Sequence, residues 1–166
     1  MRGLVAAILA ALLAGGCGSD PTGPRSAPWD LMGVAQLAAV RGAPEEVQVG
    51  GVKLRLSTYL WRDFMPVAPL DGEPLRVLLS IVTADSSAFP ANLKAEAAWV
   101  LNGRLAWATA VQESRRVPGE PVLEVFAEGG PKWGPGIAVD VVVRLRDGAG
   151  RSWYLKARGQ LIQRTD

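Results

Sequence analysis

The chain has 166 residues, no histidine and a single cysteine, and its 18 basic and 16 acidic residues give a formal net charge of +2 at pH 7. Zinc sites built on Cys and His, and Ser–His or Cys–His nucleophilic pairs, are excluded because their residues are missing. The near-neutral charge also argues against a nucleic-acid partner, since phosphate-binding domains are usually strongly basic. We therefore expect no enzyme activity, no cofactor and no metal site.

The N-terminal segment combines one basic residue, Arg2, with an apolar run from Leu4 to Ala14. The run is too short to cross a bilayer, which needs about 20 apolar residues, so it predicts a signal peptide over residues 1–16. The following Leu13-Ala14-Gly15-Gly16-Cys17 resembles the lipobox of bacterial lipoproteins, in which a lipidated cysteine becomes the new N-terminus. The family usually has Leu three residues before the cysteine, where this chain has Ala14.

The resemblance implies lipidation of Cys17 and hence palmitate-type acyl chains that anchor the protein in a membrane. Two or more chains give stable residence, at about 0.8 kcal/mol per buried methylene. The family's sorting rules read the residue after the cysteine, here Gly18, whereas the Asp that retains some lipoproteins at the inner membrane is at Asp20. We therefore expect a lipid-anchored protein of the cell envelope, at the outer rather than the inner membrane.

Residues 17–28 are rich in Gly, Pro and Ser and are predicted to form a flexible tether after the lipidated cysteine. Within residues 29–45, apolar residues such as Leu31 and Val34 fall at helical spacing, but Pro44 ends the segment. This stretch is predicted to be a short helix or an irregular cover.

From residue 46 onward apolar and polar residues alternate, which is the pattern of half-buried strands. The expected strands cover residues 47–49, 52–57, 75–82, 94–101, 104–111, 122–127, 137–146 and 153–162. Asn102-Gly103 predicts a type I′ hairpin turn, because both central positions of that turn need a positive φ. The turn would place Val100 opposite Leu105 and Ala98 opposite Trp107.

Seven to eight short strands with turn-rich boundaries predict an all-β fold over residues 46–166. The expected architecture is an antiparallel two-sheet immunoglobulin-like sandwich. The resemblance is one of architecture only, because the cysteine pair of true immunoglobulin domains is absent, and a fibronectin-like or other Greek-key sandwich fits equally well. A closed eight-stranded barrel that holds a ligand is the alternative.

Two tryptophan-bearing segments, residues 59–66 and 129–136, supply the candidate site. Counting strand directions in an antiparallel sandwich puts both segments at one end, where loops on a rigid scaffold carry recognition. The predicted contact patch comprises Trp61, Arg62, Asp63, Phe64, Lys132 and Trp133. Tryptophan beside charge occurs on sugar-binding surfaces and at protein interfaces. The structural alternative is that both rings fold inward as plugs.

Acidic residues outside the predicted patch have other possible roles. Asp140 interrupts the most β-prone run of the chain, residues 139–143, and is expected to face solvent and form a cross-strand ion pair, with a functional carboxylate as the alternative. Asp71, Glu73 and Asp85 could supply oxygen ligands for calcium, but without EF-hand spacing they are expected to be solvated loop residues.

Two functions fit these observations. The first is a non-catalytic, membrane-anchored lipoprotein that serves as a protein-interaction or envelope-assembly module. The alternative is a carbohydrate- or peptidoglycan-binding module that uses exposed tryptophans. The expected partners are the membrane, through Cys17, and either an envelope protein or a glycan.

Overall fold

The computed structural model describes residues 27–28 and 34–166. The predicted signal peptide, Cys17 and most of the predicted tether lie outside the described residues. Residues 34–166 begin with helix α1 (Val34–Arg41), and strand β1 (Ala27–Pro28) pairs antiparallel with β6. The described part of the chain holds no helix that is both long enough and apolar enough to cross a membrane.

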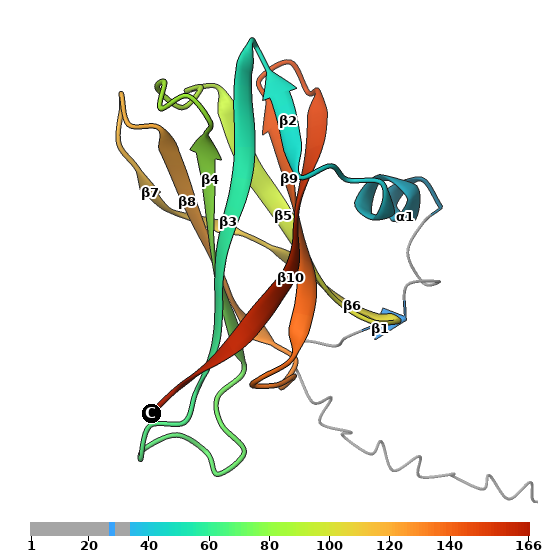
Figure 1. The fold of residues 1–166 in the computed structure, drawn as a ribbon, viewed down its shortest axis with the longest axis vertical. Coiled ribbons are helices and arrows are strands. Elements are labelled where there is room, and N and C mark those ends of the chain that lie inside the picture. The colour runs from blue at the N-terminus through green and yellow to red at the C-terminus, as the bar shows by residue number, and fades with distance from the viewer. Residues whose placement is uncertain (1–26, 29–33) are drawn as a thin grey trace, which may run out of the picture.

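The described strands form one curled sheet, so the predicted all-β class is confirmed (Figure 1). After β1 the strands are β2 (Glu46–Val49), β3 (Val52–Asp63), β4 (Leu75–Thr83), β5 (Leu93–Asn102), β6 (Leu105–Ala110), β7 (Gln112–Arg116), β8 (Val122–Gly130), β9 (Ala138–Asp147) and β10 (Ser152–Thr165). Their order across the sheet is β1-β6-β5-β9-β10-β3-β4-β8-β7, with β2 paired to β3 beside this path.

Strand β10 changes partner along its length. Its first part pairs antiparallel with β9, as far as Leu161 opposite Ala138, whereas residues 162–165 pair parallel with the end of β3. The prediction of purely antiparallel pairing is therefore wrong, and the sheet is mixed. The end of β10 runs in the same direction as β3. The alternation of apolar and polar residues along one strand does not show the direction of its neighbour, so the sequence could not reveal this pairing.

A bulge in β10 marks the change of partner. The register of β10 against β9 shifts between Ala157 and Gln160, and Gly159 has a φ of 62°. The Asp140 carboxylate accepts a hydrogen bond from the Gly159 N–H at 2.9 Å. Asp140, which was expected to form a cross-strand ion pair, thus holds the bulge, a role that depends on a register the sequence does not disclose.

Strand β7 lies in a segment that was expected to be a loop. Only one residue, Val111, separates β6 from β7, yet β6 pairs with β5 while β7 pairs with β8. The chain therefore passes from one half of the curled sheet to the other here. The sequence of β7, QESRR, has no apolar residue and its residues are mostly exposed. Such a polar edge strand discourages pairing with other chains, but it leaves no alternation to recognise.

The core lies inside the curl of the sheet. Strand β4 buries every second residue, including Val77, Leu79 and Ile81, and these belong to one cluster with Val141 and Val143 of β9. The neighbouring Val142 of β9 points to the opposite face, where it packs with Trp99 and with Val40 of α1. The run of three valines in β9 is explained by this burial on both faces, because α1 covers the outer one.

The turn between β5 and β6 lies one residue later than predicted. Asn102 pairs with Leu105 and Val100 with Trp107, so Gly103 and Arg104 form the two-residue loop. Gly103 has a φ of 56° and Arg104 is not among the positive-φ residues, which is the pattern of a type II′ turn and not of type I′. The displacement moves each cross-strand partner by two positions and leaves every residue on its predicted face.

Replacing Gly103 with valine is expected to lower the free energy of unfolding by about 1–2 kcal/mol, because a β-branched residue resists a positive φ. A Cβ at this position meets nothing within 4 Å, so the loss comes from the backbone alone. Chemical denaturation measures the change. Gly148→Val is the matched control, because its site is equally open and its φ is not positive. Equal losses in the two variants would contradict the assigned turn.

Candidate functional site

Arg62 is a buried charge at the end of β3, with an exposed fraction of 3%. Its Nε donates to the carbonyl of Glu73 (2.9 Å), its Nη1 to those of Lys132 (3.2 Å) and Gly134 (2.8 Å), and its Nη2 to that of Asp71. Burial lowers the pKa of Arg62, and the charge of Asp71 opposes that shift. We call this set of bonds the Arg62 network. It joins the β3–β4 loop to the β8–β9 loop.

The other charged members of the predicted patch lie around this network. Lys132 Nζ is 2.6 Å from the Oδ1 of Asp71, and the hydrogen bond from Lys132 is the main cause of a lowered pKa at Asp71. Asp63 Oδ1 accepts the N–H of Met65 at 2.8 Å. The Phe64 ring has the Arg62 guanidinium 5.0 Å from its centroid. These contacts hold the loops in place.

The two tryptophans of the predicted patch lie on different surfaces. Trp133 is half-buried and packs against the core cluster, which is the plug role that was the structural alternative for it. Trp61 faces outward from β3, where its ring stacks on Tyr59 with centroids 5.1 Å apart. The two loops therefore meet through Arg62, but their tryptophan rings do not form one aromatic surface.

Trp61 belongs instead to a row of rings on the outer face of β3, β4 and β8. Tyr59 pairs across with Leu78, which pairs with Phe126, and the rings of Trp61 and Phe126 are 6.0 Å apart. Tyr59 is 47% exposed. We call Tyr59, Trp61 and Phe126 the aromatic row. At its end, Arg76 lies 3.9 Å from a carboxylate oxygen of Asp63 and 3.9 Å from one of Glu128.

The sequence contained a signal for this arrangement beyond residue 57, where the predicted strand ended. Extending the alternation of β3 places Leu60 and Arg62 on the inner face, and Tyr59 and Trp61 on the outer face. Phe126 could not be found in this way, because its position beside the other rings depends on the pairing of β4 with β8.

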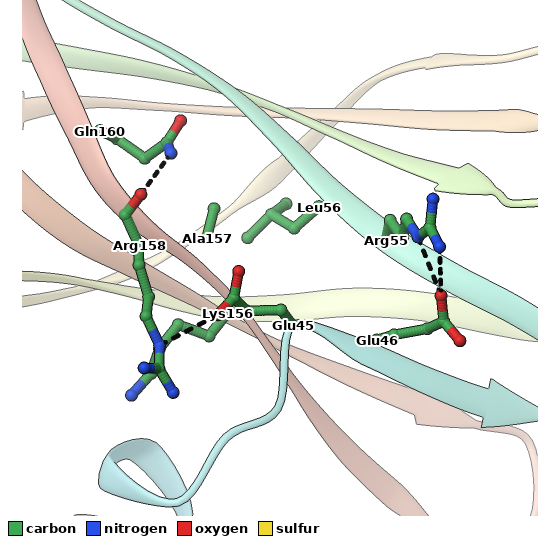
Figure 2. A pocket seen from close by; sticks show the side chains of 8 residues that line it. All are labelled: Glu45, Glu46, Arg55, Leu56, Lys156, Ala157, Arg158 and Gln160. Atoms are coloured by element: carbon green, nitrogen blue, oxygen red, sulfur yellow. Dashed lines mark hydrogen bonds and ion pairs between the residues drawn. The ribbon is translucent and has the colours of Figure 1, made fainter.

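A groove of about 370 Å³ opens where β10 bends beside β2 and β3 (Figure 2). Its lining residues are Glu45, Glu46, Arg55, Leu56, Lys156, Ala157, Arg158 and Gln160. Arg55 lies 2.8 Å from Glu46, and Arg158 lies 3.2 Å from Glu45. The hydrogen bond from Arg55 is the main cause of a lowered pKa at Glu46. The charges around the groove thus pair with one another along its walls and do not converge on a single point.

Lys156 lines the same groove but is itself buried. Its Nζ donates to the carbonyl of Arg41, the last residue of α1, at 2.9 Å, and its backbone N–H donates to the carbonyl of Pro44. These bonds attach α1 and the following segment to β10. Among the described residues, no group of three His, Cys, Asp or Glu side chains could hold a metal ion.

No protein-family model, no curated protein and no solved structure matches the chain.

Replacing Arg62 with lysine is expected to lower the free energy of unfolding by about 2 kcal/mol, because an ammonium cannot reproduce the fork of donors that reaches four carbonyls in two loops. Thermal or chemical denaturation measures the loss. Arg164→Lys is the control: Arg164 stacks on the same Phe64 ring, 4.1 Å from its centroid, but its side chain is 49% exposed. If the Arg62→Lys variant were as stable as the Arg164→Lys variant, the Arg62 network would not be what holds the loops.

Proposed function

We propose that the chain is a lipid-anchored, non-catalytic module of the cell envelope that binds another envelope component. The observation that carries the proposal is the leader, in which a short apolar run ends in the lipobox-like segment at Cys17, the only cysteine of the chain. A β domain with loops tied together at one end suits binding, because a rigid scaffold presents loops with little loss of entropy.

We also propose that the curled sheet is a two-sheet immunoglobulin-like arrangement with mixed pairing. The order β3-β4-β8-β7 corresponds to the ABED sheet of that architecture, and β10-β9-β5 corresponds to the other sheet. The core cluster supports this assignment, because it combines inward residues of β4 and β8 with those of β5 and β9. The chain then passes between the sheets from β4 to β5, from β6 to β7 and from β8 to β9, and the end of β10 joins the two sheets by pairing with β3.

The aromatic row favours a second candidate function, the binding of a glycan such as peptidoglycan. Sugar rings stack their C–H faces on aromatic faces, and Tyr59 and Trp61 present rings inclined by only 29° to each other on an outer sheet face. Asp63, Arg76 and Glu128 at the end of the row supply charged hydrogen-bonding groups for sugar hydroxyls.

Replacing Cys17 with serine is expected to move the protein from the membrane fraction to the soluble fraction, or to leave it unprocessed, because the acyl chains cannot be attached. Fractionation of cells and electrophoretic mobility measure the two outcomes. Ser19→Ala, a substitution of similar size two residues later, should leave fractionation unchanged. A Cys17→Ser protein that still pellets with membranes after high-salt and carbonate washing would contradict the anchor.

If the glycan function holds, soluble murein fragments should shift the tryptophan fluorescence of the protein. Trp61→Ala is expected to weaken binding about tenfold, the equivalent of one good ring contact. Trp153→Phe is the control, since Trp153 lies by Arg151, at the opposite end of the sheet. Absence of any shift with murein fragments, or an unchanged affinity of Trp61→Ala, would remove this candidate.

A further inference from the structure

The loop between β3 and β4 carries an exposed apolar tip. Residues 64–70 read Phe-Met-Pro-Val-Ala-Pro-Leu and include no polar side chain. Met65, Val67 and Leu70 are 44%, 95% and 106% exposed, and we call these three residues the apolar tip. Figure 1 shows the loop at the lower end of the molecule, where it extends past the ends of the strands. Contiguous apolar side chains in such a place mark a contact with another apolar medium.

The loop that carries the apolar tip is held firmly at its base. Arg62 binds the carbonyls of Asp71 and Glu73 on the far side of the loop. The Phe64 N–H donates to the carbonyl of Thr165 at 2.8 Å, and the Phe64 ring fills the space beside Gly72, where a Cβ would lie 2.6 Å from Cζ. The tip is therefore presented in a defined position, so that contact with a partner costs little further ordering.

The backbone of this loop is also suited to an apolar surrounding. Irregular backbone is normally kept out of hydrocarbon by its unpaired N–H groups. Pro66 and Pro69 have no N–H group. The N–H groups of Met65, Ala68 and Gly72 donate to oxygens within the loop or at its base, at 2.8, 2.8 and 2.7 Å. Most donors of the loop are thus already satisfied without water.

The position of the tip indicates which medium it meets. The predicted tether reaches the domain at β1, which pairs with Leu105 and Ala106, next to the Gly103 turn. The strands that lead to this turn and to the β3–β4 loop run in the same direction through the sheet. Figure 1 shows β1 at the side of the molecule and the loop at its lower end, so contact of the tip with the surface that holds the predicted anchor depends on the reach of the tether. The tether would span roughly 35 Å if fully extended, which allows the tip to touch that surface.

The charges behind the tip indicate how it would bind there. Lys132 is paired with Asp71, and Arg164 is paired with Asp166 at 2.6 Å. Because these cations are balanced by carboxylates, attraction to anionic lipid headgroups is weak, and apolar insertion is the dominant contribution.

We propose that the apolar tip inserts into the interface of a phospholipid bilayer beside the lipid anchor and orients the domain on the membrane. The inference rests on the proposed anchoring through Cys17 and deepens it, because it turns a flexible attachment into a two-point contact. The outer face with the aromatic row is then held at a fixed angle to the membrane.

The test uses the full chain, purified from a bacterial membrane and reconstituted into vesicles of phosphatidylethanolamine and phosphatidylglycerol. Leu70→Cys carries the environment-sensitive fluorophore NBD, and acylated Cys17 offers no thiol to the label. The emission at position 70 is expected to shift to shorter wavelength and to be quenched by lipids that carry a spin label on the acyl chain. Ala149→Cys, in the β9–β10 turn at the opposite end, is the control and should report water.

Each outcome decides one part of the inference. If the protein floats with the vesicles but the label at position 70 reports water, the lipid anchor is supported and the insertion of the apolar tip is contradicted. A protein that does not float with the vesicles overturns the anchor and the inference with it. Val67→Asp in the labelled protein should reduce the spectral shift, because a carboxylate beside the label resists insertion. An unchanged shift would show that the label itself enters the lipid, and would also overturn the proposal.

Discussion

A single buried guanidinium holds the loop end of this domain together. Arg62 continues the inner face of β3, after Leu60, at the point where the core ends and the loops begin. A charge in that position is tolerable only because backbone carbonyls of two loops surround it. The carbonyls in turn need a donor, because both loops lack a sheet partner at these positions. The positions of Lys132, Trp133 and the apolar tip therefore depend on the hydrogen bonds between Arg62 and these carbonyls.

The second constraint is the division of β10 between two partners. Its first part pairs antiparallel with β9, and its last residues pair parallel with β3 and so join the two halves of the sheet. The Gly159 bulge, held by Asp140, permits the bend between the two parts. The charged groove lies at this bend, and Lys156, which lines it, donates to the carbonyl of Arg41 at the end of α1.

The all-β class could be predicted because burial of one sheet face imposes a period of two on the chain, as in β4. Features that depend on pairing between distant strands could not be predicted. The polar strand β7 has no alternation, and the parallel pairing of β10 with β3 leaves no local mark. The Gly103 turn was displaced because Asn-Gly and Gly-Arg are both acceptable two-residue loops that keep the same faces. For the predicted patch, strand direction alone was enough to predict that the two loops lie at the same end. The inward direction of Arg62 could not be predicted, because the predicted strand ended at residue 57 whereas β3 continues to Asp63.

The pairing of β3 with the end of β10 has a kinetic consequence. Thr58 of β3 donates a hydrogen bond to Gln160 of β10, 102 residues later in the chain. Strand β3 therefore meets this neighbour only after β10 has been made. Contacts of such sequence separation are made late, because the entropy of closing the intervening chain is lost before they form. Until residues 162–165 have been synthesised, β3 lacks its parallel neighbour and Phe64 lacks its bond to Thr165. Until then the nascent chain remains open along this edge of β3.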